Sequence, residues 1–116
     1  MPKNYFKTFG YAYSGFKYFF RLEANAIVHL IATVFAIGLG FYFDIKATEW
    51  LWICLAITLV FSAEMFNSAI ESACDLVTTD IKPQIKAIKD ISAAAVLFTA
   101  IFAIIAAVVI FKPYIA

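Results

Sequence analysis

The sequence predicts an all-α integral membrane protein with three transmembrane helices and an N-terminal amphipathic helix on the membrane surface. Of its 116 residues, 65% are hydrophobic and only 15% are charged, and the mean hydropathy is +0.91. An ordinary soluble domain is roughly 45 to 50% apolar. The charges gather in a few short stretches and leave three long apolar tracts between them. We therefore expect a single membrane-embedded domain over residues 1–116.

Residues 1–24 form the expected surface helix. Aromatic side chains recur along it at steps of three and four: Phe6, Phe9, Tyr13, Phe16 and Phe20. Basic residues occupy an adjoining face, so the segment is too charged to span a bilayer and suits the headgroup plane. A soluble helix packed on a partner is the alternative interpretation.

Three spans are expected at residues 26–43, 48–72 and 91–111. The first contains only His29 as an ionisable residue. The uncharged stretch 50–63 covers only about 21 Å of helix, so the second span has to continue and carry Glu64 and Asn67 into or to the edge of the hydrocarbon. The third span is uncharged and rich in alanine, which permits close helix packing. We expect residues 75–90, between the second and third spans, to be a polar connection.

The basic residues predict the orientation. Four lysines and arginines precede the first span and three lie between the second and third, against one in the intervening turn and one near the C-terminus. Basic residues favour the cytoplasmic side. We therefore expect a multi-pass membrane protein whose N-terminal helix and long polar connection both face the cytoplasm.

The charge balance also excludes some functions. The formal net charge is +1 and no basic block stands out, which argues against a nucleic-acid partner. Cys54 and Cys74 have a spacing that suits neither a disulfide framework nor a metal cluster, so both are interpreted as small apolar residues.

A polar stripe follows one face of the second span. At 100° per residue, five polar positions fall within about a third of the helix circumference. They are Glu64, Asn67, Ser68, Glu71 and Asp75. Carboxylates at this depth cost a few kcal/mol each on insertion scales, so the stripe needs either partners or a function, and we favour a function.

These residue types suit phosphate transfer. Mg²⁺ takes one or two carboxylates and completes its shell with phosphate and water. Glu64 and Glu71 lie about two turns apart on this helix, and Glu23 is available as a third carboxylate. Glu64 is placed to accept a proton from a lipid hydroxyl, and Lys89 to offer a charge to phosphate. Alternatively, Glu64 and Glu71 pair with Lys89, or with basic residues of another subunit, simply to hold the bundle together. Asp90 is also an ordinary helix N-cap type, and His29 is interpreted as a neutral, hydrogen-bonded residue between helices with a supporting role.

Two sequence motifs carry a specific resemblance. The stretches EMFNSAIESACD at residues 64–75 and KDISAAAV at residues 89–96 resemble the prokaryotic diacylglycerol kinase family. The similarity extends through Tyr11 and Gly15, through residues 23–29 and through residues 49–50, so it covers nearly the whole chain. The pattern of Glu23, Asn25 and His29 is more similar to the branch that includes undecaprenol kinases than to the enterobacterial enzyme.

The resemblance implies a homotrimeric lipid kinase with active sites between neighbouring subunits. It phosphorylates a membrane lipid alcohol, converting diacylglycerol to phosphatidic acid or undecaprenol to undecaprenyl phosphate, and it uses Mg²⁺ and ATP. By position, the resemblance assigns Glu64 as the general base, Glu23 and Glu71 as Mg²⁺ ligands, Asn67 beside the reacting groups, Lys89 and Asp90 as ATP contacts, and Tyr11, Asp80 and Lys82 as weaker nucleotide contacts. The chain departs from the family in having Asn4 where an arginine is expected, and in the composition of the loop around Lys86.

Two other functions compete with this interpretation. A small proton-coupled exporter would use a membrane glutamate within an oligomer, but it requires that glutamate near the middle of the bilayer. A non-enzymatic assembly subunit would use the polar stripe only to hold helices together.

Overall fold

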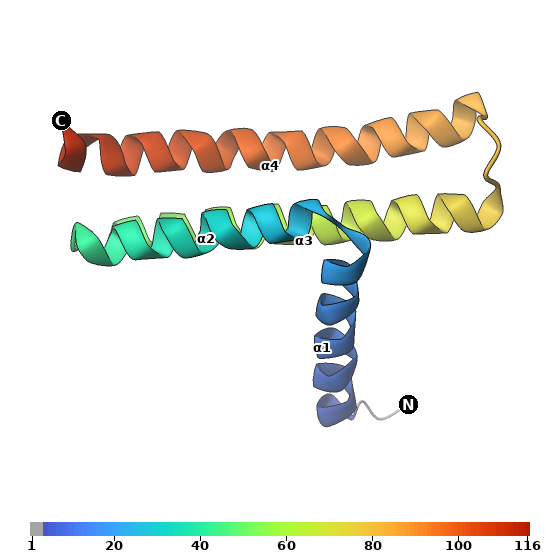
Figure 1. Cartoon of the computed structure of the whole chain (residues 1–116), viewed down its shortest axis with the longest axis horizontal. Coiled ribbons are helices and arrows are strands. Elements are labelled where there is room, and N and C mark those ends of the chain that lie inside the picture. Colours follow the sequence, from blue (N-terminus) through green and yellow to red (C-terminus); the bar gives the residue numbers. More distant parts are fainter. Residues whose placement is uncertain (1–3) are drawn as a thin grey trace.

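The computed structural model describes residues 4–116 and is entirely helical over that range, apart from short connections. It contains α1 (Tyr5–Leu22), α2 (Asn25–Tyr42), α3 (Ala47–Val77) and α4 (Pro83–Ile115) (Figure 1). Helices α2, α3 and α4 are each long and apolar enough to cross a membrane. The all-helical expectation with three apolar spans is confirmed, while the surface position of α1 and the trimer stay predictions.

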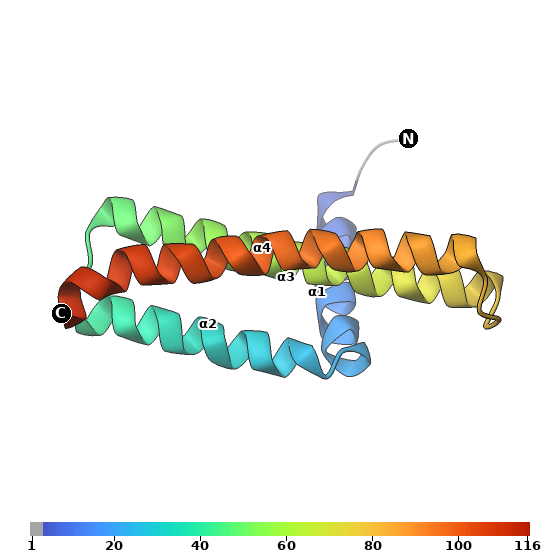
Figure 2. The same ribbon diagram turned by 90° about the horizontal axis from the view of Figure 1, so that it is seen from above.

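Helices α2, α3 and α4 lie side by side as a bundle, and α1 runs crosswise to them (Figures 1 and 2). Helices α3 and α4 are antiparallel neighbours over most of their length. Helix α1 leaves the bundle at the level where α2 begins, so the junction between α1 and α2 lies beside the middle part of α3.

Helices α3 and α4 extend well past the start of α2. With 31 and 33 residues against 18, they measure about 46 and 50 Å against about 27 Å at 1.5 Å per residue. Their shared end therefore projects beyond α1 (Figure 2). Since a bilayer's hydrocarbon is only about 30 Å thick, this end can lie outside it and carry charges.

The prediction of a long polar connection over residues 75–90 is wrong. Helix α3 continues to Val77 and α4 begins at Pro83, which leaves only residues 78–82 between the helices. Proline is well suited to the first turn of a helix because its φ is already helical. An ion pair between Lys89 of α4 and Asp75 of α3, with Nζ and Oδ1 2.9 Å apart, ties the two projecting ends together.

The buried apolar cluster lies at the other end of the bundle, around the turn between α2 and α3. It is formed by Ile45, Ile53, Ile110 and Phe111. Gly40 lies directly under the indole of Trp50, where a Cβ atom would come within 2.5 Å of the ring. The absence of a side chain there lets α2 and the start of α3 approach closely.

Helix α1 contacts the bundle only through its last turns. Phe19 is buried, and the rings of Phe16 and Phe20 lie 6.1 and 6.4 Å from that of Phe61 on α3. The aromatic residues nearer its N-terminus are exposed, with Phe6 at 91%. These aromatic contacts place the end of α1 against the part of α3 that carries the polar stripe.

Candidate functional site

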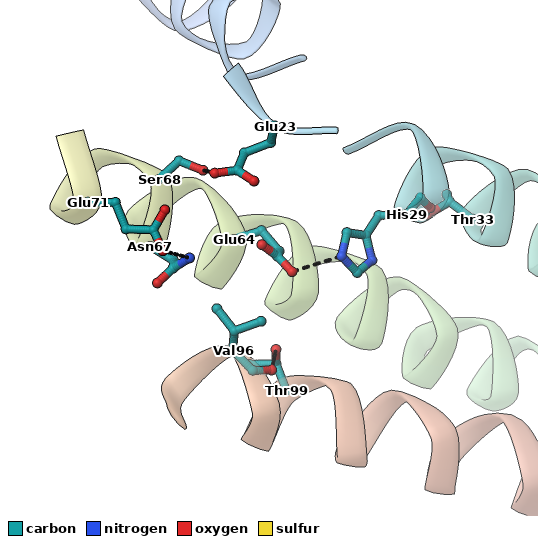
Figure 3. A network of polar contacts seen from close by, with 9 residues as sticks. All are labelled: Glu23, His29, Thr33, Glu64, Asn67, Ser68, Glu71, Val96 and Thr99. Carbon is teal, nitrogen blue, oxygen red and sulfur yellow. Dashed lines mark hydrogen bonds and ion pairs between the residues drawn. The ribbon is translucent and has the colours of Figure 1, made fainter. Parts of the chain in front are cut away.

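Four of the five residues of the polar stripe of α3 form two pairs, each with spacing i, i+4 (Figure 3), and the fifth, Asp75, pairs with Lys89 of α4. One pair, Glu64 and Ser68, is buried and bonds to groups at the start of α2 and the end of α1. The other pair, Asn67 and Glu71, is connected to α4. The stripe therefore meets three different elements of the same chain.

Glu64 is the most enclosed carboxylate of the stripe, with 7% of the residue exposed. Its Oε1 lies 2.8 Å from Nε2 of His29, in the second turn of α2. A buried carboxylate without hydrogen-bond partners costs free energy, and the contact with His29 supplies one such partner. The sequence-based interpretation of His29 as a hydrogen-bonded residue between helices is confirmed.

Glu23 occupies the junction between α1 and α2. Its extended backbone, with φ −113° and ψ 114°, ends α1, while its amide still bonds to the carbonyl of Phe19. The Ser68 hydroxyl donates to Glu23 Oε1 over 2.8 Å. Ser68 lies one turn after Glu64, so a single chain already brings Glu23 beside the face of α3 that carries the expected base. Active sites between neighbouring subunits, as the resemblance implies, stay a prediction.

Asn67 links α3 to α4. The Ser92 hydroxyl donates to Asn67 Oδ1 over 2.6 Å, and Asn67 Nδ2 donates to Glu71 Oε1 over a longer 3.4 Å. Ser92 is buried. Sequence reasoning missed it, although a serine opening the alanine-rich start of the third span was the available signal.

The expected nucleotide contacts lie at the projecting end of α3 and α4. Lys89 is held by Asp75, and Asp90 pairs with Lys86, its carboxylate 2.6 Å from Nζ. Asp80 is an exposed residue of the connecting loop, and its amide donates to the Thr78 hydroxyl.

The remaining two expected contacts are also exposed. Lys82 caps the start of α4, and Tyr11 is 73% exposed on α1. Over residues 4–116, no hydrogen bond or ion pair connects Tyr11, Asp80 or Lys82 with the polar stripe. These roles stay predictions.

The expected metal ligands come from two elements. Within residues 4–116, no group of three or more His, Cys, Asp or Glu side chains is arranged to hold a metal. Mg²⁺ does not require one, because it binds through one or two carboxylates plus phosphate oxygens and water. Glu23 and Glu71 suit that chemistry, since each is a partly exposed carboxylate. Their role as ligands stays a prediction.

Two hollows lie beside the polar residues. One, of about 460 Å³ between α3 and α4, has Asn67 and Ser92 in an otherwise largely apolar wall. The other, of about 320 Å³, lies among α2, α3 and α4, with His29 and Thr33 among alanine, isoleucine and valine side chains. Both hollows are therefore apolar spaces with polar groups in their walls.

The sequence pattern of the prokaryotic diacylglycerol kinase family matches residues 10–111. The chain is 37% identical over 110 residues to the undecaprenol kinase of Bacillus subtilis, a match that covers 95% of this chain and 89% of that protein. It is 32% identical over 103 residues to a diacylglycerol kinase of Synechocystis sp., covering 88% of this chain and 59% of that longer protein. The stretch that matches the family includes every candidate site residue from Tyr11 to Asp90.

Proposed function

The chain belongs to the prokaryotic diacylglycerol kinase family, and from that premise we propose that it transfers the γ-phosphate of Mg-ATP to the hydroxyl of a membrane lipid alcohol. The observation that carries this proposal is the buried carboxylate of Glu64, which His29 holds at the level where α1 meets the bundle.

The position of Glu64 along α3 supports a role at the membrane boundary. It lies 17 residues after Ala47, which corresponds to about 26 Å of helix, close to the roughly 30 Å thickness of the hydrocarbon. Its partner His29 is likewise only in the second turn of α2. The hydroxyl of a lipid lies at this boundary, whereas an exporter would need its glutamate near the bilayer centre. The location therefore favours the kinase.

The proposed reaction uses Glu64 as the general base. The lipid hydroxyl oxygen attacks the γ-phosphorus in line, the bond from that phosphorus to the bridging oxygen of ADP breaks, and the hydroxyl proton passes to the Glu64 carboxylate. A positioned general base contributes about 10² to 10⁴ in rate. This step requires a carboxylate that is ionised, fixed in direction and within reach of the interface.

The other polar residues are proposed to bind Mg-ATP. Glu23 and Glu71 would hold Mg²⁺, which neutralises charge on the phosphates when bound. Lys89 and Asp90 would contact the nucleotide at the projecting end of the helices, with Asn67 beside the reacting groups. The weaker contacts are assigned to Tyr11, Asp80 and Lys82. Lys89 would then exchange part of its interaction with Asp75 for phosphate oxygens.

The protein is proposed to work as a homotrimer in the bacterial cytoplasmic membrane. The basic residues before α2 and around the loop between α3 and α4 favour a cytoplasmic location for both regions, on the side where ATP is present. Only 11 to 22% of the residues in the apolar windows of α2, α3 and α4 are buried within one chain. Lipid and neighbouring copies of the chain would cover the remaining apolar surface.

Undecaprenol and diacylglycerol are the two substrates to compare. The relative with the higher identity and coverage is named an undecaprenol kinase, and the arrangement of Glu23, Asn25 and His29 resembles that branch. Both alcohols present a primary hydroxyl at the interface, so the same base and metal ligands would act on either. We therefore expect transfer to at least one of them, with undecaprenol preferred.

The test is transfer of labelled γ-phosphate from ATP to each lipid by the purified protein in lipid bilayers. Glu64→Gln should lower turnover by about 10²-fold or more while the protein stays folded, because the amide cannot accept the proton. Glu49→Gln is the matched control, since it makes the same change at the opposite end of α3. Lack of transfer to either alcohol by the parent protein would reject the function, and near-normal turnover of Glu64→Gln would reject the base.

A further inference from the structure

We propose that His29 is a positioning residue, which donates a hydrogen bond to Glu64 Oε1 and so directs the second oxygen, Oε2, toward the lipid hydroxyl. This inference rests on the proposed kinase function and assigns a specific role to a residue outside the set of expected catalytic and nucleotide contacts. It has three supports: the direction of the hydrogen bond, the accessibility of Oε2 and the way in which the imidazole ring is held.

The direction of the hydrogen bond follows from the chemistry of the two groups. An ionised carboxylate only accepts hydrogen bonds, whereas a neutral imidazole has one nitrogen that donates and one that accepts. At 2.8 Å between Nε2 and Oε1, the donor has to be Nε2–H of His29. A base must be ionised before it takes a proton, so this is the arrangement in which Glu64 is ready to act.

The second carboxylate oxygen is not fully enclosed. Figure 3 shows Oε1 of Glu64 turned to His29 and the other oxygen turned away from it. Over residues 4–116, every fully enclosed side-chain oxygen or nitrogen has a hydrogen-bond partner. No partner for Oε2 is found within that part of the chain, so this oxygen reaches accessible space although only 7% of the residue is exposed. One oxygen is thus anchored and the other is available for a proton.

The imidazole ring is itself held in place. Its centre lies 6.3 Å from that of Phe61 in an edge-on arrangement, and Phe61 in turn contacts Phe16 and Phe20 of α1. Only 25% of the His29 side chain is exposed. The donor is therefore fixed between two helices and an aromatic cluster, which is what a group that orients a base requires.

Loss of the donor would leave the Glu64 carboxylate without its partner in a largely buried place. Such a group turns toward another donor, and that rotation removes the directed base. A displacement of the order of 1 Å at a reacting group can cost about 10²-fold in rate. The effect should fall on turnover rather than on ATP binding, because Lys89 and Asp90, the main expected nucleotide contacts, lie at the projecting end of α3 and α4.

The test compares three replacements that differ in how far a donor reaches. The amide nitrogen of His29→Gln can take the place of Nε2, that of His29→Asn is too short to reach it, and His29→Ala has no donor. We expect His29→Ala and His29→Asn to lower kcat by about 10- to 100-fold with the KM for ATP changed less than about twofold. His29→Gln should recover most of that loss. The matched control is Thr33→Val, which removes only the bond from the Thr33 hydroxyl to the backbone carbonyl of His29, leaves the imidazole in place and should behave as the parent.

The outcomes separate this inference from the proposed function. Transfer by the parent and its loss in Glu64→Gln, together with parent-like kcat in both His29→Ala and His29→Asn, would overturn the role of His29 and leave the kinase intact. A kcat of His29→Gln as low as that of His29→Ala, with both proteins folded by circular dichroism, would also overturn this role, because a hydrogen-bond donor would then not be sufficient. If His29→Ala fails to fold, the kcat of His29→Gln is compared with that of His29→Asn, and equally low values would overturn the role.

Discussion

Mixing two inactive variants tests whether one chain supplies both Glu23 and Glu64 to the same site. The two variants are Glu23→Gln and Glu64→Gln, co-refolded in lipid at equal amounts. In the structure, Glu23 bonds to Ser68 of its own chain, one turn from Glu64. We therefore expect each site to take both glutamates from one subunit, so that every site in the mixture lacks one of them.

The expected activities differ clearly between the two arrangements. If both glutamates come from one chain, the mixture should be as inactive as its parents. If neighbouring subunits supply them, random assembly of a cyclic trimer gives each site an intact pair with a probability of one half times one half, about 25% of full activity. Such a difference is large against a background that is lowered about 10²-fold.

The assay is phosphate transfer to the better lipid alcohol, with a tag on one variant to pull down the other and so demonstrate mixed assembly. A mixture of parent with Glu64→Gln is the control for mixing, since about half of its sites should keep Glu64 in either arrangement. Recovery of activity toward one quarter in demonstrably mixed assemblies would refute the assignment of both glutamates to one chain.

Two further predictions concern the metal and the packing of the bundle. Replacing Glu23 or Glu71 by glutamine should lower the rate of phosphate transfer, because a carboxylate ligand is lost, and should raise by about tenfold the Mg²⁺ concentration at which the remaining rate is half-maximal. Titrations that match the parent in both variants would place the metal elsewhere. Gly40→Ala should lower the free energy of unfolding in detergent by about 1 to 3 kcal/mol, because its Cβ would come within 2.5 Å of the Trp50 ring. Gly38→Ala, which meets nothing within 4 Å, is the control, and an equal unfolding temperature for the two variants would contradict this packing.

The sequence was sufficient for the number and class of the helices. Apolar tracts of spanning length can only be satisfied as helices in lipid, because every backbone group then bonds within its own segment. The polar stripe was also readable, since its period depends only on helix geometry and not on what packs against it. The motifs at residues 64–75 and 89–96 were by themselves specific enough to identify the family.

The ends of the helices were predicted less well. Hydropathy assigned charged residues such as Asp75 and Lys89 to a connection because charges are costly in lipid. In the structure both residues are helical. Helices that are longer than the hydrocarbon layer is thick project into water, and there Asp75 of α3 and Lys89 of α4 form an ion pair. The length of a helix and the length of its membrane-crossing part are separate quantities, and hydropathy reports only the second.

Only the tertiary structure decided which member of the stripe meets which partner. Periodicity put Glu64, Asn67, Ser68 and Glu71 on one face, but their partners come from residues 25 to 45 positions away for the contacts that leave α3. Ser92 had no periodic signal that connected it with Asn67, and nothing along α2 alone connected His29 with Glu64. The physical reason is that hydrogen bonds act over about 3 Å, so their partners depend on how the helices pack against one another, which no local pattern along a single helix specifies.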